Sequence, residues 1–150
     1  MPNNGFCEIV NFQSHDEIES THEFEVVGEY MNVDMNKTKE YYLSSDSLPC
    51  KCAYCQNYVR KIEQKHPDVM RFLTGINIDI TRPFELMSVE LDKNNVEYML
   101  CQYIVYGNCK DDYHNSIKGI EFGKSSCHPS TNITEEHFVL EFGPIVLEME

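Results

Sequence analysis

The sequence lacks tryptophan, long apolar runs and an excess of basic residues. No apolar run approaches the roughly 18 residues that a bilayer-spanning helix needs, so we do not expect a membrane protein. Lys and Arg number 12 against 25 Asp and Glu, which gives a formal net charge of −13. Nucleic-acid binding depends on cationic side chains that displace counterions. A nucleic-acid partner is therefore not expected for most of this surface.

The start of the chain also lacks the marks of a secretory signal. Residues 1–7 contain neither a basic region nor an apolar stretch. We therefore expect a cytoplasmic protein. In that reducing compartment, the seven cysteines indicate buried residues, metal ligands or redox groups rather than a disulfide framework.

Several familiar catalytic motifs are missing from the chain. It contains no Gly-x-Gly-x-x-Gly, no complete Walker Gly-x-x-x-x-Gly-Lys-Ser/Thr, no Gly-x-Ser-x-Gly and no His-Glu-x-x-His. Their absence lowers the weight of an enzymatic interpretation. The favoured class is a non-enzymatic binding or structural domain.

The charge that is present is unevenly distributed. Residues 51–82 carry six Lys or Arg against three acids, whereas residues 1–50 and 83–150 are both strongly acidic. An acidic surface attracts cations and basic proteins, so the expected partner is a basic protein. The competing interpretation is plain solubility, since a net charge far from zero keeps small proteins apart. The pattern does not address the oligomeric state.

The pattern of apolar residues predicts strands on both sides of a helical segment. Residues 1–22 are polar and weakly patterned, which predicts a mobile arm before a single domain of residues 23–150. Alternation over residues 23–31 predicts a strand, with a turn at 32–36 and a return strand over Thr38–Leu43. The remaining predicted strands lie after Pro83, at residues 86–91, 96–106, 117–122, 138–142 and 145–149.

The helical segment lies between these two groups of strands. Apolar residues recur there at spacings of three and four, in a stripe formed by Cys55, Val59, Ile62, His66, Val69 and Leu73. Pro67 cannot lie inside an unbroken helix, but it fits the first position of a new one. We therefore predict one kinked helix or two consecutive helices, at 54–65 and 67–74, that end at Gly75. The fold class is α+β, a meandering antiparallel sheet with these helices packed on one face.

Three cysteines at the start of this segment carry the most specific chemistry. Cys50, Cys52 and Cys55 follow a polar loop and enter the predicted helix. Zinc takes four N or S ligands, often supplied in part by a Cys-x-x-Cys turn, and a helix N-terminus stabilises thiolates. We interpret the three cysteines as metal ligands, with zinc as the candidate ion. The candidates for the fourth ligand are Cys109, His114, Cys127 and His128.

The same cysteines admit two other interpretations. Cys52 and Cys55 have the spacing of a redox dithiol, with Cys52 as the exposed nucleophile and Cys55 as the resolving thiol. Familiar dithiol oxidoreductases, however, join this motif to a parallel sheet, and this chain is predicted to be antiparallel. In the other interpretation, Cys55 packs in the helix stripe while Cys50 and Cys52 are ordinary loop thiols.

Two stretches of the sequence resemble a family of small acidic bacterial proteins. One is the Cys-x-x-Cys-x-Asn-Tyr motif from Cys52 to Tyr58, and the other runs from Gly75 to Glu85. The likeness extends weakly through residues 96–106 and 136–144. It implies a bacterial, cytoplasmic origin and no particular activity. It also implies that Cys50 is an addition to the family's recurring motif, which weighs against a three-thiolate site.

Overall fold

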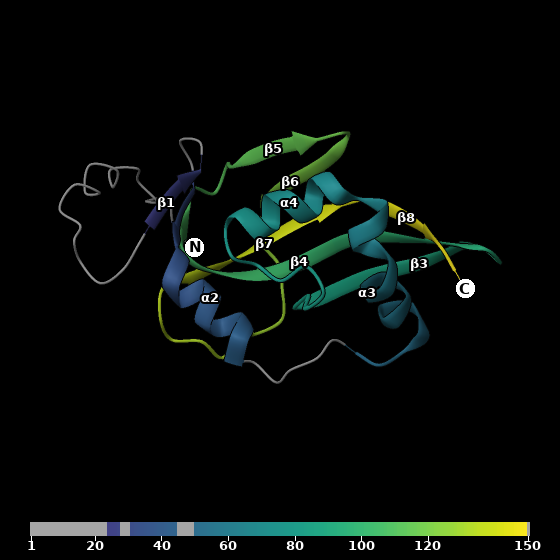
Figure 1. Cartoon of the computed structure of the whole chain (residues 1–150), viewed down its shortest axis with the longest axis horizontal. Helices are drawn as coiled ribbons and strands as arrows, with labels where there is room; N and C mark the ends of the chain where they lie inside the picture. The colour runs from purple at the N-terminus through teal and green to yellow at the C-terminus, as the bar shows by residue number, and fades with distance from the viewer. Residues whose placement is uncertain (1–23, 28–30, 45–49, 150) are drawn as a thin grey trace.

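The structure is a computed structural model that describes residues 24–27, 31–44 and 50–149. Within those ranges it contains one eight-stranded antiparallel sheet and three helices. Two of the helices, α3 and α4, lie across the same face of the sheet (Figure 1). The predicted α+β class is therefore confirmed. The predicted arm at residues 1–22 lies outside the described residues.

The bounds of the elements follow chain order. The strands are β1 (Phe24–Val27), β2 (Met31–Asp34), β3 (Glu85–Asp92), β4 (Asn95–Cys109), β5 (His114–Ile117), β6 (Ile120–Lys124), β7 (His137–Gly143) and β8 (Ile145–Glu148). The helices are α2 (Met35–Ser44), α3 (Ala53–Lys65) and α4 (Pro67–Gly75). In these ranges, none of the helices combines the length and the apolar composition of a bilayer-spanning segment.

The long strand β4 is the centre of the sheet. Its first half pairs with β3 on one side and with β8 on the other. Further along, residues 101–106 pair with β7, and residues 107–109 pair with β2. Beyond β7 the sheet continues through β6 to β5. All of these pairs are antiparallel, which confirms the antiparallel sheet predicted for the residues after Pro83.

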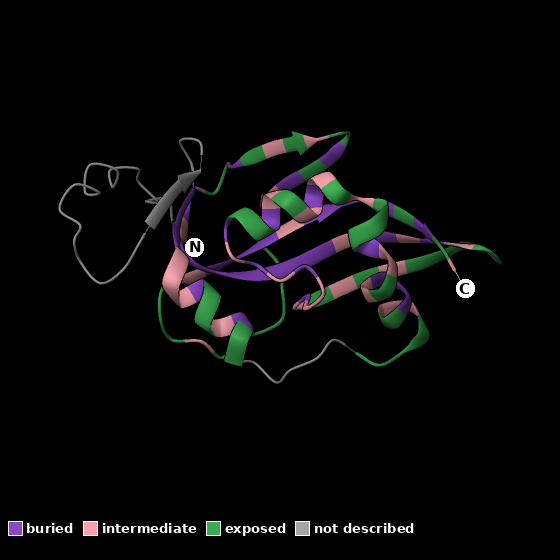
Figure 2. Cartoon of the chain, in the orientation of Figure 1, coloured by how far each residue is buried: buried purple, intermediate pink, exposed green. Residues whose placement is uncertain are grey.

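The two predicted consecutive helices are confirmed as α3 and α4. Pro67 occupies the first turn of α4, where its missing N–H has no helical partner to lose. The predicted stripe faces the sheet, because Ile62, Val69 and Leu73 are all buried in the main core. Burial of a side chain of this size contributes about 1.5–3 kcal/mol. Figure 2 shows the buried residues of both helices on the side that faces the sheet.

Helix α2 corrects the prediction of a strand at Thr38–Leu43. The reason lies on β4. On the side where β3 pairs as far as residue 102 and β2 begins at residue 107, no described strand pairs with residues 103–106. There the backbone N–H of Tyr106 donates to Thr38 Oγ1 at 3.1 Å, and Tyr42 Oη donates to the carbonyl of Ile104 at 2.8 Å. A helix therefore satisfies backbone groups that a strand edge would leave unpaired.

Two further strand predictions were wrong in their bounds. The predicted strand at 23–31 is divided between β1 and β2, which pair as a hairpin with Val27 opposite Met31. Residues 32–34 belong to β2 and residues 35–36 to α2, so the predicted turn at 32–36 is wrong. The predicted strand at 117–122 is interrupted by Lys118 and Gly119, which both adopt positive φ and form the turn between β5 and β6. Lysine rarely adopts positive φ, so Lys118 itself does not indicate a turn.

Candidate metal centre

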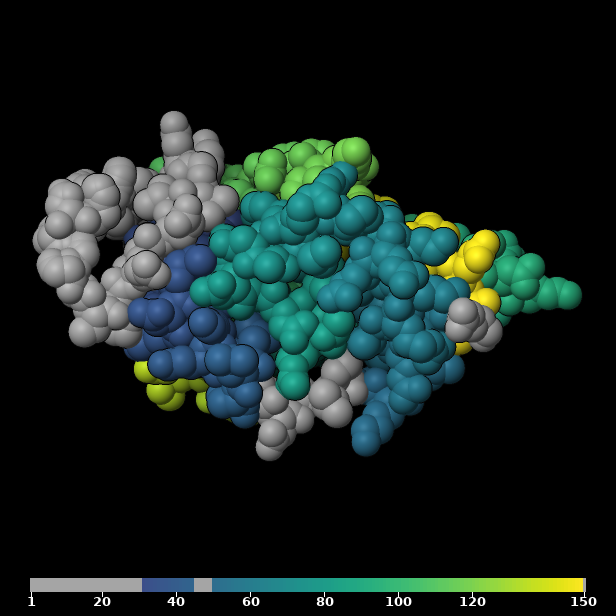
Figure 3. Space-filling model, in the orientation of Figure 1, coloured from purple at the N-terminus to yellow at the C-terminus, as the bar shows by residue number. Residues whose placement is uncertain are grey.

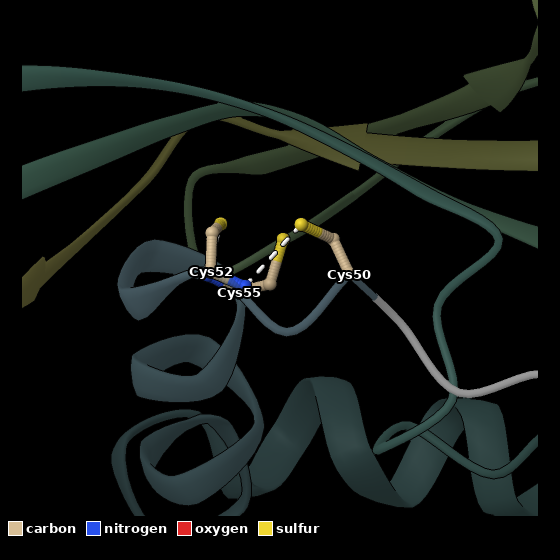
Figure 4. A group of neighbouring side chains, drawn as sticks. All are labelled: Cys50, Cys52 and Cys55. Atoms are coloured by element: carbon tan, nitrogen blue, oxygen red, sulfur yellow. Dashed lines mark hydrogen bonds between the residues drawn. The ribbon is translucent and has the colours of Figure 1, made fainter.

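Cys50, Cys52 and Cys55 come together where the chain enters α3. Their Sγ atoms all lie within 4.8 Å of one another. Cys50 and Cys52 are exposed, and Cys55 is half-buried in the first turn of the helix. Figure 4 shows the three side chains directed to the same side of the loop and helix. The predicted grouping of these three cysteines is therefore present.

Hydrogen bonds to the backbone hold two of the thiols in place. Cys52 is the N-cap residue of α3, and its Sγ accepts from the backbone N–H of Cys55 at 3.4 Å. Cys50 Sγ accepts from the backbone N–H of Cys52 at 3.3 Å. An N-cap side chain normally satisfies an unpaired helix N–H with oxygen. Here sulfur fills that position, so the local structure itself brings the sulfur atoms together.

The thiols differ in their acidity. The hydrogen bond from the backbone N–H of Cys55 lowers the pKa of Cys52, and a hydrogen bond with Cys50 acts in the same direction. Burial, together with a hydrogen bond and a charge interaction with Cys52, raises the pKa of Cys55 to about 12. In the absence of a cation, Cys52 is thus the more acidic thiol, while Cys55 keeps its proton. A bound metal ion would lower the pKa of Cys55 and remove its proton, because the ion stabilises thiolates directly.

The spacing of the sulfur atoms is compatible with a metal ion. Zn–S bonds of about 2.3 Å in a tetrahedron place the sulfur atoms about 3.8 Å apart. The separations of at most 4.8 Å need only small side-chain rotations to reach that value. Three thiolates are also soft ligands, which favour zinc, Cu(I) or iron–sulfur chemistry over magnesium or calcium. The cysteine group could therefore hold a metal ion.

The structure does not bring the four candidate fourth ligands into this group. In the part of the chain that it describes, the group consists of the three cysteines alone. Cys109 is buried at the end of β4, and His114 begins β5, where its Nε2 contacts Glu121 at 2.5 Å. Cys127 and His128 are exposed in the loop between β6 and β7. The fourth ligand stays a prediction.

A hollow of about 360 Å³ lies beside Cys50. Its walls carry three cationic side chains, Lys51, Arg60 and Arg82. The other lining residues are Gln56, Val59 and Thr81. Positive charge next to the thiols favours their ionised form. The loop after α4 brings Thr81 and Arg82 to the same wall as Lys51 and Arg60, a placement that the spacing of the cysteines did not predict.

Buried hydrogen bonds fix the start of α3 on the sheet. Asn57 is fully buried and donates from Nδ2 to the backbone carbonyl of Glu148 at 2.9 Å and to Tyr98 Oη at 3.4 Å. Tyr98 Oη in turn donates to the backbone carbonyl of Tyr54 at 2.7 Å. These bonds link the first turns of α3 to β4 and β8. The cysteine group is therefore built on a rigid base.

Comparisons with known proteins attach no family to this geometry. No family model matches the chain, and no curated protein or solved structure matches it either. The resemblance of residues 52–58 to small acidic bacterial proteins stays a prediction. We therefore infer function from the geometry of the cysteine group.

Proposed function

We propose that this domain is a non-enzymatic binding or structural protein in which Cys50, Cys52 and Cys55 bind one zinc ion. The observation that carries the proposal is the approach of three Sγ atoms to within 4.8 Å at the start of α3. Three thiolates bring one more negative charge than zinc neutralises. The side chains of Lys51 and Arg60, which line the adjacent hollow, offset that excess.

The zinc ion would act by tying the loop before α3 to the helix. Cys50 belongs to the loop, whereas Cys52 and Cys55 belong to the cap and the first turn. A metal bound by all three fixes where the helix begins, and its binding energy adds to the stability of the folded chain. The fourth position would be filled by water or by a donor from outside the group.

Metal content and affinity test this proposal. Protein purified without added metal and without chelators is expected to contain one zinc per chain by mass spectrometry. Cobalt added to the zinc-free protein should give the absorption of sulfur-to-cobalt charge transfer. Cys52→Ser removes one of three ligands, and we expect it to weaken zinc binding by about 100-fold or more, as loss of a ligand or its support does.

Cys127→Ser is the matched control, because it removes an exposed thiol outside the group. This variant should bind zinc like the unaltered protein. Failure of the unaltered chain to bind zinc or cobalt would contradict the proposal. An equal loss of affinity in Cys127→Ser would make Cys127 a ligand as well, and would contradict a site formed by the three cysteines without it.

A second candidate function, thiol–disulfide exchange, is favoured by the contrast between Cys52 and Cys55. Cys52 is exposed with a lowered pKa, and Cys55 is half-buried three residues later. The Cys52 thiolate would attack a partner disulfide and release one partner thiolate. The Cys55 thiolate would then displace the second one, which leaves a Cys52–Cys55 disulfide and a partner reduced by two electrons.

Two observations place this function second to metal binding. The pKa of about 12 keeps Cys55 protonated, which slows the displacement step. The exchange also has no use for the nearby Cys50. Cys50→Ser separates the two functions. If the group binds zinc, this variant should have a weaker zinc affinity. If the group exchanges disulfides, the oxidation of Cys52 and Cys55 by glutathione disulfide should be unchanged.

A further inference from the structure

The outer face of β3, β4 and β8, which points away from α3, is unusually apolar for a solvent-exposed surface. Of the six exposed large hydrophobic side chains in the described ranges, five belong to these three strands. They are Met87 (44% exposed), Val89 (42%), Leu91 (51%), Met99 (44%) and Val146 (49%), here called the outer strip.

The strand register and the alternation of side chains place the members of the outer strip on β3 and β8 on one face, whereas Met99 lies at a register shift in β4. Val89 lies opposite Glu97 on β4, and Glu97 lies opposite Val146 on β8, so the three form a row across the sheet. The other face of β3 points to the helices, because Tyr54 Oη on α3 donates to a Glu90 carboxylate oxygen at 3.3 Å. Side chains alternate along a strand, so Met87, Val89 and Leu91 point away from α3.

The charge on this outer face has one sign. β3, β4 and β8 contain no Lys or Arg. Glu97 lies inside the row, while Glu85 and Glu148 are exposed at two of its margins. An apolar centre with a charged margin is typical of a surface that binds another protein.

The edge of β3 adds a backbone binding site to this surface. In the part of the chain that the structure describes, β3 pairs with β4 and with no other strand. Its outer N–H and C=O groups are therefore available for an added strand. Strand addition draws affinity from the backbone hydrogen bonds and specificity from alternate side chains.

We propose that the outer strip and the edge of β3 bind an extended, cationic segment of another protein in which apolar residues alternate with Lys or Arg. Its apolar side chains would cover Met87, Val89 and Leu91, and its cations would meet Glu85 and Glu97. A second copy of this chain is the less suitable occupant. It would bring a net charge of −13 and the same glutamates to the interface, and like charges placed opposite each other are unfavourable.

This surface does not depend on the metal centre, so the two proposals can fail separately. The probe is a fluorescein-labelled peptide of about ten residues, long enough for one strand, in which Lys and Val alternate. A peptide of the same composition with the Lys and Val residues in separate blocks controls for charge alone. Binding is measured by fluorescence anisotropy, and amide chemical shifts from NMR locate it. We expect the alternating peptide to bind more tightly and to shift the amides of residues 85–92.

Matched variants show which residues carry the binding. The double variant Val89→Thr with Val146→Thr keeps β-forming residues in both strands but removes apolar surface. It should weaken the affinity for the alternating peptide about fivefold or more. Leu43→Thr removes an apolar side chain that is 75% exposed elsewhere, on α2, and should have no effect. Glu97→Gln should weaken binding, whereas Glu63→Gln, an exposed acid on α3, should not.

Two outcomes would overturn the proposal. One is equal binding of the two peptides with no difference between the strip variants and their controls, which would leave only general attraction to an acidic protein. The other is a dimer in analytical ultracentrifugation that Val89→Thr with Val146→Thr dissociates, which would make a second copy the occupant.

Discussion

The two faces of the first half of β4 differ strongly in how far the rest of the molecule buries them. On the face under the helices, Tyr98, Cys101 and Tyr103 are fully buried. Tyr103 Oη donates to the carbonyl of Ile80 at 2.7 Å and shares a 2.6 Å hydrogen bond with Tyr58 Oη. On the opposite face, the first half of the same strand places Glu97 between Val89 and Val146, two apolar side chains that are 42% and 49% exposed. One strand thus supplies both the most constrained part of the core and the outer surface that we propose for binding.

Along the first half of β4, packing and polar contacts are therefore concentrated on the covered face, whereas the outer face carries side chains that contribute little to the fold. Residues can be changed on the outer face at small cost in stability, because they lose little buried area. The same change under the helices leaves a cavity or an unpaired polar group. The predictions below test this difference.

Alkaline pH should produce the largest effect, which is complete unfolding. Burial raises the pKa of Tyr58 and Tyr103 well above the ordinary value of 10.0, and it raises the pKa of Cys101 from 9.0 to about 12. The folded chain therefore holds these protons more tightly than the unfolded chain. The stability from these groups is fully present below pH 9 and is lost progressively as the pH rises through the folded values.

Ultraviolet absorbance of tyrosinate and far-ultraviolet circular dichroism, followed together against pH, test this expectation. Tyr54 is partly exposed, and the Glu90 carboxylate raises its pKa less far than burial raises that of Tyr58 or Tyr103. It should therefore ionise before them, with the fold intact. The buried tyrosines should ionise only as the dichroism is lost. If all tyrosines ionise while the dichroism stays unchanged, the covered face is not sealed from solvent.

Ile62→Ala should have the next largest effect. Ile62 is completely buried between α3 and the sheet, and large-to-small changes at such sites lower the free energy of unfolding by about 2–5 kcal/mol. Urea unfolding measures the change, with Val89→Ala on the outer face as the matched control. Similar losses in the two variants would contradict the contrast between the faces.

Val89→Thr should have the smallest effect. Its side chain is 42% exposed, and threonine retains the β-branched shape that strands favour. We expect the free energy of unfolding to change by less than about 0.5 kcal/mol, with an unaltered far-ultraviolet spectrum. A loss as large as that of Ile62→Ala would mean that the outer strip is covered in the folded chain.

Local rules predicted the part of the fold around α3 and α4. The stripe at helical spacing and the position of Pro67 specify both helices without reference to distant residues. In α2 the local rules failed. Thr38, Tyr41 and Tyr42 are strand-forming residues, but contacts with Ile104 and Tyr106 on β4 decide the conformation. Such contacts between residues far apart in sequence are not visible in a local pattern.

The candidate site also has a part that local spacing predicts and a part that depends on distant residues. The spacing of Cys50, Cys52 and Cys55 was enough to predict their grouping, because the three residues lie within one loop and one helical turn. Arg82 reaches the neighbouring hollow only through the fold of the loop after α4. The outer strip was missed because Met87, Val89 and Leu91 alternate with Ser88 and Glu90, and such a pattern predicts that the apolar side is covered. In the structure α3 lies over the other side, where it contacts Glu90.

The construction of the sheet around β4 has a consequence for how the chain folds. β4 finds its neighbours in residues 31–33, 85–92 and 137–148, so its pairing joins segments that are distant along the chain. Contacts of this kind slow folding, because a long loop must close, at a cost in entropy, before the contacts that stabilise it can form. A fragment that stops before residue 137 would leave one side of the longest strand bare along residues 95–106, and such an edge recruits strands from other chains. In the full chain the sheet is therefore completed only after residues 137–148 have joined β4. Forms that lack these residues should aggregate rather than fold in part.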